Sequence, residues 1–304
     1  MSLFNAYMSL SGVTDATVTR GERLAHHTTL HVGGPVGLWI VAHGYTGLAR
    51  VVTVLDRERV PWVVLGRGSN VLAADKGFEG AIITLDDEFA RLSVGDDGTV
   101  TAGAGLLLSK LVNEAMRHGL SGLEPCVGIP GTVGGAVSMD AGTRHEWIGK
   151  RVHDVVTYRP GEGMRRYDGG EIEWGYRRCT LPADEIILET TFTLLPAEKA
   201  AIAADMDARL RRRRQSQPVG KPSCGSVFVN PGTSSVGMLV EGCGLKGLVK
   251  GGAQVSTTHA NFIVNNGGAT AADVVSLMGT VHDAVLERYK VDLRPEVKLV
   301  GFGA

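Results

Sequence analysis

The chain has 304 residues, of which 43% are hydrophobic and 21% are charged. At roughly 150 residues per domain, this length predicts about two domains with a substantial buried core. The 31 Lys and Arg residues balance the 32 Asp and Glu residues, so no overall positive field is available and nucleic acid is not an expected partner. No apolar run reaches the ~18 residues of a membrane span, and the N-terminus lacks the basic region of a signal peptide.

Glycine is the compositional outlier, with 42 residues and no collagen-like repeat. The cysteines form no CxxC pair, so they predict neither a zinc ribbon nor a disulfide framework but free thiols in a reducing cytoplasm. These cysteines are Cys126, Cys179, Cys224 and Cys243. The histidines at positions 26, 27 and 31 have no partners at metal-ligand spacing, so no metal site is predicted.

The first half of the chain alternates helical and strand-like patterns. Residues 47–59 have the apolar spacing of a helix, and the apolar run 62–65 that follows Pro61 predicts a buried strand. This strand leads into GRGSN at 66–70 and then into a second strand-like run at 71–74. A Rossmann dinucleotide fingerprint requires a helix directly after its glycines, so that class is excluded. Further strands are expected at 80–85 and 99–102, with a turn at 96–98 and a helix at 106–118.

A second glycine-rich segment at 128–136 opens the second half. The composition changes after the basic run 211–214, at Gln217-Pro218-Val219-Gly220, which predicts a domain boundary. Thr270 and Asp273 have the spacing of a capping box for a long helix over 270–289. The other expected elements are strands at 152–158, 171–174, 186–194, 226–230, 261–264 and 293–300, and helices around 202–210 and 234–241.

The two glycine-rich turns predict a nucleotide site. We expect each turn to leave a strand and to present backbone N–H groups to a diphosphate without a following helix. Either turn alone is as consistent with a simple tight turn. Together, with a helix between them, they favour a flavin dinucleotide.

Several ordered motifs resemble the UDP-N-acetylenolpyruvoylglucosamine reductase family over nearly the whole chain. The branch it resembles is the shorter one, which lacks a tyrosine-bearing insertion after the Gly-Tyr-Arg motif. The matching motifs are TTLHVGG at 28–34, GRGSNVL at 66–72, GIPGTVGGAVSMDAG at 128–142, GYR at 175–177, QP at 217–218, GSVFVNP at 225–231, GLKG at 244–247, GGAQVSTTHANFIVN at 251–265 and PEV at 295–297.

The resemblance implies an α+β fold with an FAD-binding domain of the vanillyl-alcohol-oxidase type. It implies a small N-terminal lobe at 1–65, joined by the final strand at 291–304, an FAD-binding core at 66–214 and a substrate-binding C-terminal domain at 215–290. The implied activity is NADPH-dependent, FAD-mediated reduction of UDP-N-acetylglucosamine enolpyruvate to UDP-N-acetylmuramate in peptidoglycan precursor synthesis. FAD is expected to be non-covalent, and a cytoplasmic monomer acting on small molecules is expected, with no nucleic acid or membrane partner.

The resemblance also assigns site residues. Arg177 corresponds to the catalytic arginine, Ser226 to the proton-donating serine and Glu296 to the glutamate of the final strand. Hydride addition to an enolpyruvyl ether leaves carbanion character beside a carboxylate, so a cation and an acid are chemically required. The residues expected to bind FAD are Gly66, Arg67, Gly68, Ser69, Asn70, Gly128, Ile129, Pro130, Gly131, Thr132, Gly134 and Gly135. Those expected to bind substrate are Tyr176, Arg214, Asn230, Lys246, Gln254 and His259.

Three positions depart from the family pattern without touching the catalytic residues. Asp140 stands where Asn is usual, Val229 where Lys or Arg is common, and Cys179 where Ser is usual.

Two other functions are compatible with a flavin-binding fold. An oxidase is disfavoured because no residue matches the environment of a covalently flavin-linked histidine. A flavin-binding regulator with a decayed site would lack at least one of Arg177, Ser226 and Glu296, and all three are present.

Overall fold

The computed structural model describes residues 2–232 and 234–303. The chain divides into two compact units, each assembled from separated stretches. Unit 1 consists of the described residues up to Arg20 together with Leu38–Gly66 and Gly80–Arg211. Unit 2 consists of Gly21–Gly37, Arg67–Glu79 and the described residues from Arg212 onward. The functional domains expected at 1–65 with 291–304, at 66–214 and at 215–290 stay a prediction.

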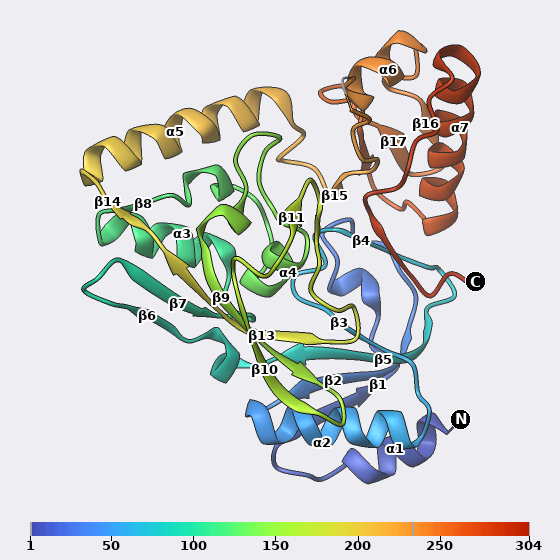
Figure 1. Ribbon diagram of the computed structural model, residues 1–304. Coiled ribbons are helices and arrows are strands. Elements are labelled where there is room, and N and C mark those ends of the chain that lie inside the picture. The colour runs from blue at the N-terminus through green and yellow to red at the C-terminus, as the bar shows by residue number, and fades with distance from the viewer. Residues whose placement is uncertain (1, 233, 304) are drawn as a thin grey trace. The chain divides into compact units, whose positions relative to one another are not determined.

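Unit 1 contains a four-stranded sheet covered by two helices. In spatial order its strands are β1 (Ala16–Arg20), β2 (Val36–Ala42), β5 (Phe78–Leu85) and β3 (Trp62–Val64). The helices α1 (Leu3–Leu10) and α2 (Gly44–Arg57) lie together against this sheet (Figure 1). The predicted apolar stripe of α2 is buried in the core between them, at Leu48, Val51, Val52 and Leu55.

Unit 1 also contains a five-stranded antiparallel sheet. Its order is β10 (Gly163–Asp168), β9 (Val152–Arg159), β13 (Ile186–Thr193), β7 (Thr99–Gly103) and β6 (Leu92–Val94). The helices α3 (Leu108–Arg117) and α4 (Val133–Ser138) share its hydrophobic core. The remaining elements are the paired short strands β8 (Leu120–Ser121) and β14 (Leu195–Pro196), the hairpin of β11 (Trp174–Gly175) and β12 (Arg178–Cys179), the 3-10 turns Asp87–Ala90, Glu124–Cys126 and Ile148–Arg151, and helix α5 (Lys199–Ser216), which runs past the division between the units.

Unit 2 is built around a second four-stranded antiparallel sheet. Its order is β15 (Ser223–Ser226), β18 (Phe262–Asn265), β17 (Ala253–Val255) and β16 (Val249–Lys250). Helices α6 (Val236–Gly242) and α7 (Ala271–Tyr289) contribute to its core, and α7 contacts β16 and β17 (Figure 1). The unit also contains a 3-10 turn at Leu24–His26. Strand β4 (Val71–Ala73) pairs in parallel with β19 (Lys298–Val300).

Most of the expected elements are confirmed. The predicted capping box of α7 is present: the Thr270 side chain accepts a hydrogen bond from the Asp273 N–H, and the Asp273 side chain accepts one from the Thr270 N–H. Four expectations are wrong. Of the strand expected at 293–300, only Lys298–Val300 is a strand. The strand expected at 171–174 is a turn that precedes β11, and the strand expected at 226–230 ends at Ser226. The second glycine segment follows a 3-10 turn and opens the short helix α4, so only the first loop lacks a following helix.

Among the described residues, no helix is both long enough and apolar enough to cross a membrane. Within the same residues, no group of three or more His, Cys, Asp or Glu side chains could hold a metal ion. All four cysteines are free thiols.

Candidate active site

The two glycine-rich segments meet within unit 1. The first begins at Gly66, directly after Leu65, whose N–H donates to the Ile83 carbonyl at 2.9 Å. A Cβ placed on Gly66 would lie only 2.5 Å from the Thr132 Oγ1. The second glycine segment therefore comes so close to residue 66 that only glycine fits there.

The second glycine segment is a tight turn that ends in a helix cap. Gly128 and Gly131 have φ values of +72° and +136°, which side-chain-bearing residues rarely adopt. Thr132 caps α4 by accepting from the Gly135 N–H at 3.4 Å. A Cβ on Gly134 would lie 2.8 Å from that of Ala104, so the helix packs closely on the strand-to-helix connection before α3.

The remainder of the first glycine loop belongs to unit 2. Gly68 has a φ of +59°, and a Cβ there would lie 2.3 Å from the His27 carbonyl oxygen. The Thr29 N–H donates to the Gly68 carbonyl at 3.2 Å, and the Thr29 hydroxyl donates to the Ser223 carbonyl at 2.6 Å. The TTLHVGG motif thus fastens the glycine loop to the strand that carries Ser226.

The glycine segments have donors to offer a diphosphate. Within the described chain, the backbone N–H groups of Arg67, Gly68, Gly131 and Thr132 donate to no protein acceptor. Unused N–H groups on glycine-rich turns form concave anion sites. Taken by itself, each turn therefore offers donors that fit a phosphate group of a dinucleotide such as FAD: Arg67 and Gly68 in unit 2, and Gly131 and Thr132 in unit 1.

Arg177 occupies a strained turn in unit 1. Tyr176 and Arg177 form the two-residue loop between β11 and β12, and Arg177 has a φ of +61°. A positive φ at the second loop residue is usual for Gly or Asn, and a residue with a longer side chain adopts it at a cost of about 1–2 kcal/mol. Strain of this kind is common at functional sites.

The surroundings of Arg177 fix its guanidinium. Its Nη1 donates to the Gly142 carbonyl at 3.2 Å, and its Nε is buried. The guanidinium carbon lies 5.2 Å from the centre of the Tyr176 ring, within cation–π distance.

Ser226 lies at the end of a bulged strand in unit 2. The registers Ser223 to Val264 and Ser226 to Phe262 leave one extra residue in β15, and Gly225 has a φ of +78°. A bulge of this kind redirects the side chain that follows it.

Glu296 is brought next to the Ser226 segment. Its N–H donates to the Val227 carbonyl at 2.7 Å, and its own carbonyl accepts from the Asn70 side chain at 3.1 Å. Within unit 2, Glu296 is therefore joined by short hydrogen bonds to Val227, the residue after Ser226, and to the glycine-loop residue Asn70. Arg177 belongs to the other unit.

A nearby thiol is not a candidate nucleophile. Burial, with a smaller contribution from the charge of Glu296, raises the pKa of Cys224 to about 12. Cys224 therefore remains protonated at neutral pH.

The predicted substrate residues differ in how far their polar atoms are engaged. Gln254 donates to the Gly247 carbonyl and accepts from Asn266, so both ends of its amide serve the fold. Lys246 is paired with Glu241 at 3.1 Å. The Asn230 Oδ1 accepts from the Val236 N–H at 2.9 Å and so helps to cap α6.

His259 has a defined tautomer when it is neutral. Its Nδ1 accepts from the Asn261 N–H at 3.2 Å, so the ring proton of the neutral form is on Nε2. Burial lowers the pKa of His259, and the nearby Lys246 charge lowers it too, although Glu241 and a backbone hydrogen bond oppose this. The neutral ring therefore has one N–H to donate.

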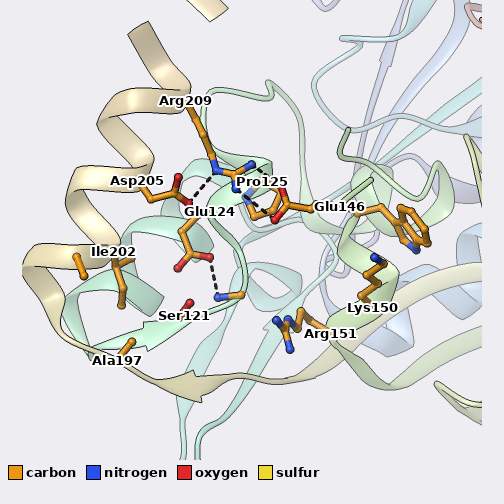
Figure 2. Close-up of a pocket in the computed structure, with 13 residues that line it drawn as sticks. Ser121, Glu124, Pro125, Glu146, Lys150, Arg151, Ala197, Ile202, Asp205 and Arg209 are labelled. Carbon is orange, nitrogen blue, oxygen red and sulfur yellow. Dashed lines mark hydrogen bonds and ion pairs between the residues drawn. The ribbon is translucent and has the colours of Figure 1, made fainter. Parts of the chain in front are cut away.

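Two cavities lie on the separate units. One of about 420 Å³ in unit 2 is lined by the predicted residue Arg214 together with Lys221, Gln217, Pro218 and Thr258, among others. The other, of about 370 Å³ in unit 1, has none of the predicted site residues in its lining (Figure 2). In this second cavity Arg209 binds both Glu146 oxygens, at 2.8 and 3.2 Å, and Asp205 at 2.8 Å.

Sequence reasoning missed two supporting residues. Asn261 is buried and binds both the N–H and the carbonyl of Phe228, at 3.0 and 2.8 Å, which holds the segment after Ser226 away from the sheet ladder. Thr29 joins the glycine loop to β15, as described above. Asn261 and Thr29 lie within the matching motifs GGAQVSTTHANFIVN and TTLHVGG, and this membership was the signal in the sequence that could have identified them.

Comparisons with known proteins agree over nearly the whole chain. A model described as an FAD binding domain matches residues 39–159, and one described as the C-terminal domain of UDP-N-acetylenolpyruvoylglucosamine reductase matches residues 217–300. The reductase of that name from Halalkalibacterium halodurans is 40% identical over 96% of this chain and 97% of its own. The one from Heliobacterium modesticaldum is 42% identical over 92% of this chain and 90% of its own. The crystal structure of the Thermus caldophilus reductase superposes with a TM-score of 0.81 at 36% identity, covering 94% of this chain and 98% of that one.

Proposed function

The chain belongs to the UDP-N-acetylenolpyruvoylglucosamine reductase family, and from that premise we propose that Arg177, Ser226 and Glu296 form its catalytic group. The chain is an FAD-dependent oxidoreductase that uses NADPH to reduce UDP-N-acetylglucosamine enolpyruvate to UDP-N-acetylmuramate for peptidoglycan synthesis. The observation that carries the assignment of the residues is the connection, within unit 2, of Glu296 to Val227, the residue after Ser226, and to Asn70.

The glycine segments hold the cofactor in this proposal. The N–H groups of Arg67 and Gly68 in unit 2, and those of Gly131 and Thr132 in unit 1, are each donors suited to phosphate oxygens of FAD, and the other predicted loop residues shape the two turns. FAD held there would supply the hydride chemistry, with NADPH as the source of the hydride and the terminal carbon of the enolpyruvyl group as its acceptor.

Arg177 binds the substrate carboxylate. A guanidinium offers two parallel N–H donors to a carboxylate, and its charge stabilises the negative charge that develops as hydride arrives. The Gly142 carbonyl and the strained turn hold this group before substrate binds, so less order has to be imposed during the reaction.

Ser226 delivers the proton to the carbon next to the carboxylate. Ser226 ends the bulged strand β15 directly after Gly225, and a bulge changes the direction of the side chain that follows it. Glu296 orients this donor and polarises the developing enolate, since its backbone is fixed to the residue after Ser226 and its Oε2 is buried.

The sugar nucleotide is bound by the remaining predicted residues. Arg214 and Lys221 give the cavity of unit 2 two cations suited to phosphate oxygens. His259 donates from Nε2, while Tyr176, Asn230, Lys246 and Gln254 contribute through the donors and ring surface that their structural contacts leave available.

The finer assignments form part of the same proposal. FAD is non-covalent, the chain acts as a monomer, and the compartment is the cytoplasm, where the NADPH and nucleotide-sugar pools are found. Residues 66–214 form the FAD-binding core, the N-terminal lobe 1–65 is joined by the final strand 291–304, and residues 215–290 form the substrate-binding domain, to which the core adds Tyr176, Arg177 and Arg214.

A single anaerobic experiment tests the function. The purified protein is expected to show a bound-flavin spectrum that bleaches with NADPH and recovers when enolpyruvyl-UDP-GlcNAc is added. UDP-GlcNAc, which lacks the reducible double bond, is the matched control and should give no recovery. Recovery with oxygen alone, but not with the enolpyruvyl compound, would favour an oxidase and contradict the proposal.

A further inference from the structure

The segment 138–142 runs beside the turn that carries Arg177, and two hydrogen bonds join them. Arg177 Nη1 donates to the Gly142 carbonyl at 3.2 Å, and the Cys179 thiol donates to the Ser138 carbonyl at 3.6 Å. Asp140 lies midway between these two anchoring carbonyls. All of these residues belong to unit 1.

Asp140 is an unusual residue for this position. It is only 2% exposed, and its Oδ1 accepts from the Gly149 N–H at 3.0 Å. Its Oδ2 is buried and has no hydrogen-bond partner among the residues that the structure describes. A buried carboxyl oxygen without a partner is costly, so its retention here calls for an explanation.

Of the ionisable groups that interact with Asp140, Arg177 is the one through which the Asp140 charge can affect substrate binding. These groups are Arg177 in the hairpin turn, Lys150 in the 3-10 turn after the segment, and Cys179 in β12. Lys150 is held elsewhere, since its ammonium donates to the His145 carbonyl at 2.8 Å and lies 4.1 Å from the Trp147 ring centre. Burial raises the pKa of the Cys179 thiol, which therefore stays neutral.

The ionisation of Asp140 falls close to neutral pH. Burial raises the pKa of this carboxyl to about 6, although the Gly149 hydrogen bond and the charges of Arg177 and Lys150 act in the opposite direction. The charge beside Arg177 therefore changes between about pH 5 and 7, while the guanidinium itself stays protonated.

We propose that Asp140 is a positioning residue that sets, through Arg177, how tightly the site holds the carboxylate of its substrate. This inference rests on the proposed function of Arg177. When Asp140 is ionised, its charge offsets part of the positive potential of the guanidinium. When Asp140 is protonated, the full potential acts on the substrate carboxylate, and binding is tighter.

The test compares two ligands that differ in the enolpyruvyl group. Binding of enolpyruvyl-UDP-GlcNAc and of UDP-GlcNAc to the FAD-loaded protein is measured by calorimetry without NADPH, from pH 5 to pH 8. At pH 8 the isosteric Asp140→Asn variant should bind the enolpyruvyl ligand about tenfold more tightly than the unaltered protein, the scale of a neighbouring charge in a partly buried site. At pH 5 the affinities of the variant and of the unaltered protein for the enolpyruvyl ligand should be equal. UDP-GlcNAc should bind both equally at every pH.

Asp154→Asn is the matched control, because Asp154 is also buried in unit 1 but is paired with Arg166 and His153. It should leave the preference for the enolpyruvyl ligand unchanged. Three results would overturn the inference: equal affinities of Asp140→Asn and unaltered protein at pH 8, a gain that is the same at pH 5, or an equal gain for UDP-GlcNAc. A different failure, in which the unaltered protein does not distinguish the two ligands at any pH, would count against the role of Arg177 itself.

Discussion

Replacing Asp140 by Asn should make the protein more stable at neutral pH. The unfolded chain ionises this carboxyl near its usual pKa of 3.8, whereas burial holds the folded-state pKa at about 6. Below pH 3.8 the group is protonated in both states and costs nothing. As the pH rises from 3.8 to about 6, the unfolded state releases its proton first, so the free energy of unfolding falls.

The size of this loss follows from the two pKa values. At about 1.4 kcal/mol per pKa unit, their difference corresponds to about 3 kcal/mol above pH 6. An Asn side chain has the same shape, keeps the Oδ1 acceptor for the Gly149 N–H and cannot ionise. The variant should therefore gain up to about 3 kcal/mol at pH 7.5, which raises Tm by roughly 6–12 °C for a unit of this size.

Thermal unfolding followed by circular dichroism between pH 4.5 and 8 measures the effect. The Tm difference between Asp140→Asn and the unaltered protein should be small at pH 4.5 and should widen as the pH rises through 6. Asp154→Asn should instead lower Tm, because the Asp154 oxygens accept from Arg166 at 2.6 Å and from His153 at 2.9 Å. A gain that does not depend on pH, or a loss of stability at pH 7.5, would refute the reasoning.

Three further predictions concern the proposed site. Ser226→Ala should leave flavin reduction by NADPH nearly unchanged and slow reoxidation by the enolpyruvyl substrate by a factor of ~10² to 10⁴, as expected for loss of a general acid. Rapid mixing measures the two half-reactions separately. Equal slowing of both half-reactions would show that Ser226 supports the loop instead of donating a proton. Arg177→Lys should also slow reoxidation, because a two-pronged cation becomes a point charge, so an unchanged rate in the same assay would contradict the role of Arg177. Gly68→Ala should destabilise the protein by more than about 1 kcal/mol and reduce FAD retention on gel filtration, because the φ of Gly68 is +59° and the added Cβ would meet backbone atoms. The control Gly279→Ala, in the open middle of α7, should stabilise the protein by about 0.5–1 kcal/mol. If Gly68→Ala retained FAD and stability like the unaltered protein, the close approach at Gly68 would be excluded.

Local signals predicted the elements that are stabilised locally. The capping box and the buried stripe that predict α7 are formed by residues close together in the sequence, and the apolar spacing that predicts α2 is local in the same way. The edge strand β10 was missed because its sequence GMRRYD is polar, and it forms through six register pairs with β9. The strand expected at 226–230 ends early because Asn261 and Glu296 take the backbone groups of residues 227 and 228.

The sequence names residues for the candidate site, which stay a prediction, but it could not give their geometry. The glycine motifs and the family resemblance indicated Arg177, Ser226 and Glu296. The positive φ of Arg177 and its bond to Gly142 come from contacts between distant segments, which no local pattern encodes. The second glycine segment ends in a helix because the cap at Thr132 is fixed by its tertiary setting, although VGGAVS has weak helix propensity.

The parallel pair of β4 and β19 determines when the protein can mature during synthesis. Asn70 and Glu296 are 226 residues apart along the chain, yet their hydrogen bond and the adjoining strand pair belong to one compact unit. Such non-local pairing is formed slowly, because the loop between the partners has to close first. On the ribosome, the residues around Asn70 emerge long before their partners. We therefore expect unit 2 to remain an open, aggregation-prone nascent chain until residues 298–300 have left the exit tunnel, whereas the segments of unit 1 are all synthesised by residue 211.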